Sequence, residues 1–162
     1  MKKETTNTKA ILILLIPVFL LFIVRALMEL NVIIRAKNAE NYYKALIAKD
    51  YEKAYNHVFL WDTNPKEKSK NYTSEEGQRI YVDRLKKLEM EQNYRILKAK
   101  VTVSRYGAGE PLYGATLEVQ VNGKIINVGE SLEFVKGNKL WISNSRDANW
   151  LLRDGRMGLG DG

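Results

Sequence analysis

Apolar side chains are most concentrated near the start of the chain, where residues 10–24 read AILILLIPVFLLFIV without interruption. Lys9 precedes this run and Arg25 follows it. A membrane-spanning helix usually needs about 20 mostly apolar residues, and residues 26–30 extend the run because most of them are good helix formers. Lys9 and Arg25 can lay their apolar stems along such a helix and keep their charges at the headgroups. The pattern therefore predicts a transmembrane helix over residues 10–30.

Two other interpretations of this run are a cleaved signal peptide and the core helix of a soluble protein. A signal peptide has a similar basic start and apolar stretch, but it also requires small residues at a cleavage site. Here the run ends in Val24-Arg25. A core helix is disfavoured by the density of the run and its terminal position. Three lysines in residues 1–9 favour a cytoplasmic tail. We expect an uncleaved, single-pass anchor in the cell membrane, with the N-terminus cytoplasmic and the domain extracytoplasmic.

After an expected linker over residues 31–37, apolar residues recur at helical spacing as far as Val58. Asp50 divides this stretch, because an aspartate at that position can accept backbone hydrogen bonds and cap a new helix. Two helices are therefore expected to meet near Lys49. The apolar positions of the two helices are Ala39, Tyr43, Leu46 and Ile47, then Tyr51, Ala54, Tyr55 and Val58.

The next stretch, from Trp61 to Tyr72, is rich in charge and contains Asn64-Pro65, which predicts a loop. Thr73 and Glu76 then have the spacing of a capping box, which marks the start of a helix. A third helix is expected from there to about Met90. Its apolar side would carry Ile80, Tyr81, Leu85 and Leu88.

From Arg95 onward the period changes to strict alternation, which is typical of strands. Asn122-Gly123 separates two alternating segments and predicts a tight hairpin, because both positions tolerate positive φ. A last strand is expected after a turn at Gly137-Asn138. In each of these segments the alternate apolar residues share one face of the strand, which is expected to point inward. They are Leu97, Ala99, Val101 and Val103, then Tyr113, Ala115, Leu117, Val119 and Val121, then Ile126, Val128, Leu132 and Phe134.

These elements predict an α+β protein. One N-terminal transmembrane helix would precede a domain over residues 38–145, in which three helices pack on a curved antiparallel sheet of about four strands. Residues 146–162 would form a C-terminal tail.

Composition excludes some classes of protein. Four basic residues and one acidic residue give residues 1–25 a charge of +3, so the remaining chain carries +4 of the total of +7. That excess is mixed with acids and lacks nucleic-acid motifs, so no nucleic-acid partner is expected. The absence of cysteine means that the fold rests on its hydrophobic core. An extracytoplasmic domain without disulfides suits a bacterial envelope protein.

Three segments carry a resemblance to a known family. Residues 42–46 and 50–55 resemble the opening helices of nuclear transport factor 2-like domains, and the closing hairpins, which end in residues 137–142, resemble the final strands of that fold. The resemblance covers the stretch from about Asn38 to Ser145. The membrane-tethered bacterial members are the most similar in layout. They include the domain preceding the transpeptidase in methicillin-resistance penicillin-binding proteins, and single-span subunits of type IV secretion and conjugation machines. The resemblance implies a cone with a pocket at its wide end, in a family of isomerases, dehydratases and proteins that only bind partners.

Candidate pocket residues are Tyr43, Tyr55, His57, Asp62 and Glu130. His57, the only histidine, could act as an acid or base with a nearby carboxylate, or simply end a helix where positive charge is favourable. The tyrosines could offer hydroxyls to a ligand, but such residues more often line the edge of a core. Glu130 shares inward parity, but a bulge at Gly129 would turn it to solvent, and this is the outcome we expect.

We therefore assign no catalytic residue, metal or cofactor. The expected function is a non-catalytic interaction or assembly module in the bacterial envelope, held by the bilayer through residues 10–30. Its partner would be an envelope protein or a second copy of itself. The alternative is a small-molecule binding protein, or an isomerase- or dehydratase-like enzyme, that uses the pocket of the cone.

Overall fold

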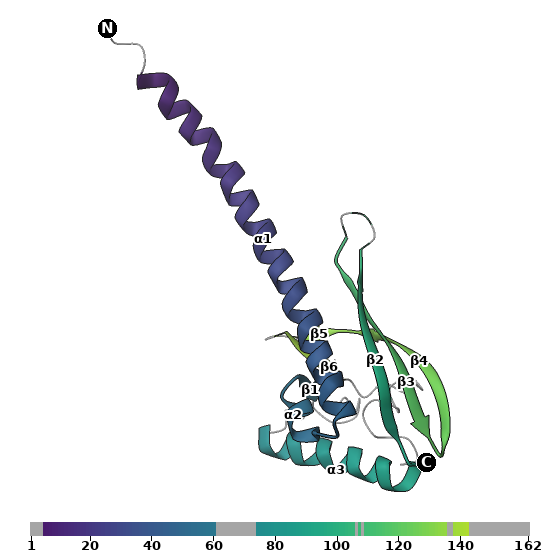
Figure 1. Ribbon diagram of the computed structural model, residues 1–162. Helices are drawn as coiled ribbons and strands as arrows, with labels where there is room; N and C mark the ends of the chain where they lie inside the picture. The colour runs from purple at the N-terminus through teal and green to yellow at the C-terminus, as the bar shows by residue number, and fades with distance from the viewer. Residues whose placement is uncertain (1–4, 61–73, 106, 108, 136–137, 143–162) are drawn as a thin grey trace, which may run out of the picture. The chain divides into compact units, whose positions relative to one another are not determined.

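The computed structural model describes residues 5–60, 74–105, 107, 109–135 and 138–142 (Figure 1). The chain divides into two compact units, Met1–Ile34 and Arg35–Gly162. Within the described residues the first unit is helical, and the second combines helices and strands, so the predicted α+β class is confirmed. The expected loop from Trp61 to Tyr72, the capping residue Thr73 and the tail 146–162 lie outside the described residues.

Helix α1 is a single helix over Thr5–Ile47. It is long and apolar enough, from Ile16 onward, to cross a membrane by length and composition, and its most apolar window is not buried within the structure. The expected linker over residues 31–37 is part of the helix. No glycine or proline occurs between Val18 and Ile47, so nothing in the backbone chemistry interrupts the helix there.

The predicted junction near Lys49 is confirmed. Lys49 has a φ of 58°, and the backbone N–H groups of Lys49 and Asp50 bond back to the last turn of α1, which ends the helix in a Schellman-type cap. The Asp50 carboxylate then accepts from the backbone N–H of Lys53 and starts α2, Tyr51–Tyr55. The predicted third helix is α3, Ser74–Gln92.

Six strands in the described residues form two three-stranded sheets, where one sheet of about four strands was predicted. The larger is antiparallel with the order β2-β3-β4, from Arg95–Ser104, Leu112–Val121 and Lys124–Leu132. The smaller has the order β1-β6-β5, from Val58–Leu60, Lys139–Ile142 and Phe134–Val135.

Strand β1 was not expected, because Val58 fits the helical spacing of the segment before it. In the structure Val58 pairs in parallel with Leu140, a residue far along the chain.

The β3–β4 hairpin has the predicted turn, with φ values of 50° at Asn122 and 79° at Gly123. Its register runs without a break from Val121 opposite Lys124 to Tyr113 opposite Leu132. The bulge expected at Gly129 is therefore wrong, and Gly129 simply pairs with Thr116. The irregularity lies instead in β2, between Ile96 and Lys98.

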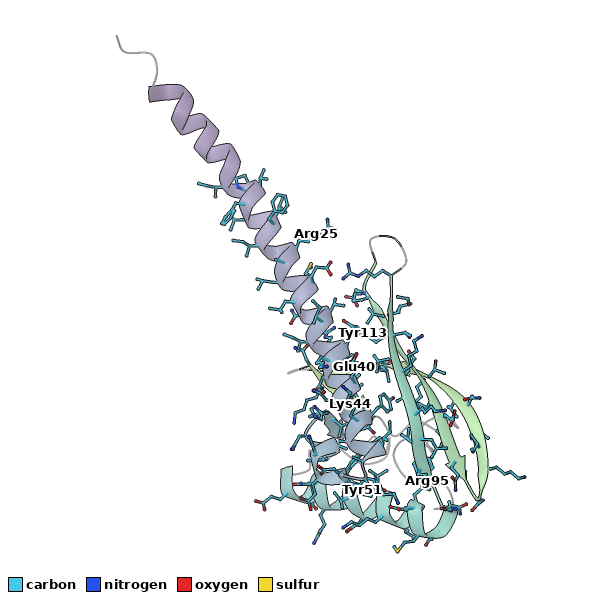
Figure 2. All side chains as sticks on the ribbon, in the orientation of Figure 1. Arg25, Glu40, Lys44, Tyr51, Arg95 and Tyr113 are labelled. Carbon is cyan, nitrogen blue, oxygen red and sulfur yellow. The ribbon has the colours of Figure 1, made fainter. Side chains whose placement is uncertain are left out.

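The core of the second unit lies between its helices and the inner face of the larger sheet. The inward parity predicted for β3 is confirmed, because Tyr113, Ala115, Leu117 and Val119 are all buried. The predicted apolar side of α3 is confirmed at Tyr81, Leu85 and Leu88. Figure 2 shows the side chains of these elements, with Tyr113 labelled on β3 and Tyr51 on α2. From the helices, the other core residues are Ala39, Tyr42, Tyr43, Ala45, Leu46, Ala54 and Val82.

Candidate functional site

Glu130 is the one charged residue that the described part of the chain buries. It lies on β4 with a relative exposure of 8%, on the same inner face as Val128 and Leu132. Because no bulge shifts the register, the carboxylate points into the domain, and the expectation that it faces solvent is wrong. Burying a carboxylate costs free energy unless hydrogen bonds replace its water.

Tyr43 supplies such a hydrogen bond. Its hydroxyl donates to Glu130 Oε2 at 2.5 Å, and its relative exposure is 1%. The two residues come from α1 and β4 and are far apart in sequence, so this bond ties the helix to the sheet across the core. A hydrogen bond from a hydroxyl to an ionised carboxylate is stronger than one between two neutral groups. The structure therefore brings together two of the five candidate residues.

Other aromatic residues surround this pair. The ring of Tyr42 makes an edge contact with Tyr43 at 5.0 Å between centroids, and the Tyr42 hydroxyl accepts from that of Tyr81 at 3.1 Å. Tyr113 on β3 contacts Phe134 on β5 at 4.8 Å between ring centroids, which joins the two sheets. Tyr42, Tyr43 and Tyr81 thus form an aromatic core whose hydroxyls bond inside the domain. The buried Tyr113 hydroxyl has no hydrogen-bond partner among the described residues.

His57 lies elsewhere, in the turn between α2 and β1, and it is half-buried. Its ring Nδ1 is 2.6 Å from Asn38 Oδ1. The Asn38 amide nitrogen donates to the carbonyls of His57 at 3.1 Å and of Asn138 at 2.8 Å. Because both carbonyls can only accept, they fix the amide with Oδ1 toward the imidazole, and Nδ1 must carry the proton. In the neutral ring, Nε2 therefore holds the lone pair.

Burial lowers the pKa of His57 from its ordinary value, and the positive charges of Lys53 and Lys139 lower it further. Among the described residues, the charged groups that perturb it are both cations. The same cluster extends to Arg35, whose Nε donates to Asn138 Oδ1 at 3.0 Å. The hydrogen bonds of His57 thus hold α1, the turn before β1 and the turn before β6 together.

Of the remaining two candidates, the structure describes only Tyr55. Tyr55 is half-buried beside Tyr81, with ring centroids 5.7 Å apart, and burial raises the pKa of its hydroxyl. Asp62 lies outside the described residues.

A second polar cluster, which the sequence did not indicate, joins α2 to α3. The Tyr51 hydroxyl donates to Glu89 Oε2 at 2.7 Å, and Lys49 forms an ion pair with Glu89 Oε1. Hydrogen bonds from Lys49 and Tyr51 lower the pKa of Glu89, while burial and the neighbouring Glu89 raise the pKa of Tyr51. Spacing in sequence could not reveal this cluster, because about 40 residues separate its halves.

A shallow hollow of about 420 Å³ lies on β2, β3 and β4. Small residues line most of it, including Thr102, Gly114 and Gly129, and Tyr113 and Glu130 are also among its lining residues. Within the described part of the chain, no three histidine, cysteine or acidic side chains gather as they would around a metal ion.

We compared the chain with models of protein families, with curated proteins and with solved structures. No family model matches it, and neither a curated protein nor a solved structure is significantly similar to it.

Proposed function

We propose that this chain is a membrane-anchored, non-catalytic interaction module of a bacterial envelope, whose extracytoplasmic α+β unit docks partner proteins or further copies of itself. The observation that carries the proposal is the exposed apolar surface of α1. Side chains such as Phe22, with a relative exposure of 70%, surround the helix, and its most apolar window has no buried share. In water such a surface is unfavourable, at roughly 25 cal/mol for each Å² of apolar area. A bilayer removes that cost.

The second unit supports a structural rather than a catalytic role. Its buried carboxylate, Glu130, is engaged by the Tyr43 hydroxyl, and the Nδ1–H of His57 is engaged by Asn38. Glu130 and His57 thus each take part in holding elements together. A reactive group is instead usually oriented toward a place that a substrate can reach. A nuclear transport factor 2-like cone is part of this proposal, supported by helices that come first and a hairpin-connected sheet that follows.

Membrane fractionation of cells that express the full chain tests the anchor. We expect the protein to stay in the pellet after washing with alkaline carbonate and to leave it in detergent. Protease added outside intact cells or spheroplasts should digest residues 35–162 and spare residues 1–9. Recovery of the intact chain in the carbonate supernatant would remove the anchor, and protection of the domain would reverse the orientation.

Crosslinking tests the docking role. Photoreactive amino acids placed at exposed positions of the second unit, in the membrane-bound full chain, should produce discrete adducts with an envelope protein or with a second copy. A strictly monomeric chain that forms no adduct from any position would contradict the role.

One observation favours the alternative, a small-molecule site. The hollow on β2, β3 and β4 is lined in part by Tyr113 and Glu130, so a ligand there would lie near a buried carboxylate. Native mass spectrometry of the full chain released from detergent after incubation with cell metabolites tests this alternative. A bound metabolite that is lost in Glu130→Gln but retained in Glu118→Gln would favour it over the docking module.

A further inference from the structure

Contacts of Arg35 and Phe134 mark the end of the second unit at which the chain enters it. Arg35, the first residue of this unit, has its guanidinium carbon 5.9 Å from the centroid of the Phe134 ring. Phe134 in turn contacts the ring of Tyr113, which is paired with Val103 across β2 and β3. The residue at which the chain enters the domain is therefore close to the end of the sheet where β2 and β3 are joined.

The opposite end of the sheet is equally well marked. Arg95 at the start of β2 pairs with Gln120 near the end of β3, and the turn residue Asn122 bonds to Gln92 of α3. Figure 2 labels Tyr113 and Arg95 at these two ends of the sheet. The connection between β2 and β3 therefore lies at the end of the sheet where Arg35 enters, and the β3–β4 turn lies at the end that contacts α3.

Apolar side chains are exposed at this hairpin end. Leu112, the first residue of β3, has a relative exposure of 56%, and Val103 near the end of β2 has 39%. Lys100 and Arg105 contribute two positive charges to residues 100–112, against one negative charge from Glu110. Exposed apolar residues beside basic ones suit the surface of a bilayer, where the apolar groups enter the acyl boundary and the charges meet anionic headgroups.

We propose that the hairpin end, defined by Val103, Arg105 and Leu112, is a second membrane contact that inserts into the surface of an anionic bilayer. The inference rests on the proposed anchor, because chain continuity brings Arg35 to within a few residues of the membrane-spanning segment. At about 1.5 Å per residue, the helix sets Arg35 only roughly 7.5 Å beyond the expected end of the span at residue 30. A contact of this kind would hold the domain against the bilayer and restrict its rotation about the anchor.

The absence of cysteine makes a clean test possible. The full chain would carry a single cysteine at Leu112→Cys, labelled with an environment-sensitive fluorophore, and be reconstituted in vesicles of phosphatidylglycerol and phosphatidylethanolamine. Ile125→Cys is the matched control, because Ile125 is an exposed apolar residue of the same sheet, at 60%, beside the turn at the opposite end. The readouts are emission wavelength, quenching by lipids that carry a nitroxide near the headgroup, and flotation of the protein with the vesicles.

We expect a blue-shifted emission and several-fold stronger lipid quenching at position 112 than at position 125, with both effects reduced in Arg105→Glu. A chain that floats with the vesicles but shows equal, weak quenching at both positions would overturn the hairpin contact and leave the anchor standing. A blue shift at 112 without lipid quenching would indicate a protein contact and would also overturn it. A chain that fails to float would remove the anchor proposal and this inference with it.

Discussion

The bond between Tyr43 and Glu130 offers the sharpest test of how this domain is held together. Tyr43→Phe removes the hydroxyl that donates to Glu130 Oε2 and changes no other heavy atom. Both side chains are buried, so water cannot readily replace the lost donor. A hydrogen bond to a charged group contributes about 1.5–3 kcal/mol to stability. We therefore expect the free energy of unfolding to fall by about 2 kcal/mol or more, since the carboxylate stays in the core.

A control lies one residue away. Tyr42→Phe makes the same chemical change at an equally buried position, but its hydroxyl bonds to the neutral hydroxyl of Tyr81. The expected loss is about 1 kcal/mol, as for an ordinary neutral hydrogen bond. The contrast between the two variants therefore measures the effect of the carboxylate and cancels the general cost of removing a tyrosine hydroxyl.

Urea unfolding of the full chain in mild detergent, followed by near-ultraviolet circular dichroism, provides the assay. For a domain of about 130 residues, the loss at Tyr43 corresponds to a fall in Tm of about 5–10 °C. Combining Tyr43→Phe with Glu130→Gln completes a double-mutant cycle, in which we expect a coupling energy above about 0.5 kcal/mol. Equal losses at positions 42 and 43, or a coupling energy near zero, would refute the idea that this bond fastens α1 to β4.

Three further predictions follow from local geometry and charge. The pKa of His57 is lowered below 6.5 in the folded state, so its imidazole takes up a proton more readily in the unfolded chain. The free energy of unfolding should therefore fall as the pH drops below about 6.5, and urea titrations of His57→Gln should lack that fall. The pKa of Glu89 is lowered by favourable partners, so this residue stabilises the fold above the ordinary value of 4.5 and loses that stabilisation as the pH falls through the folded pKa. Lys49→Met should reduce this loss of stability in acid unfolding curves. Gly123→Ala should cost about 1 kcal/mol in thermal unfolding because φ is 79° there, whereas Gly129→Ala, with ordinary φ and open space around the added Cβ, should be close to neutral.

Much of the local structure could be predicted because it depends on neighbours in sequence. The junction at Lys49 and Asp50 follows from an aspartate that can cap a helix, and the hairpin at Asn122-Gly123 follows from two residues that tolerate positive φ. The inward parity of β3 follows from alternation alone. The continuity of α1 through residues 31–37 was missed, since residues 31–34 are weaker helix formers and the expected membrane span ended at residue 30.

The errors arose where long-range pairing decides the outcome. Strand β1 exists because Leu140, about 80 residues away, supplies its partner, and a three-residue strand carries too short a pattern to be recognised alone. The orientation of Glu130 depended on whether Gly129 shifts the register, and the unbroken pairing with β3 settled that question. The importance of Asn38 was also invisible, because its three partners lie in the turns before β1 and β6.

By itself, the sequence determined the apolar N-terminal helix, the succession of helices followed by strands, and the caps and turns between them. Each of these follows from periodicity or backbone preference within a few residues. Only the tertiary structure decided that a carboxylate is buried against a tyrosine, and that the sole histidine is locked by an asparagine amide. Both arrangements depend on which distant segments meet, because the cost of burying a polar group is offset only when its partner arrives from another part of the chain.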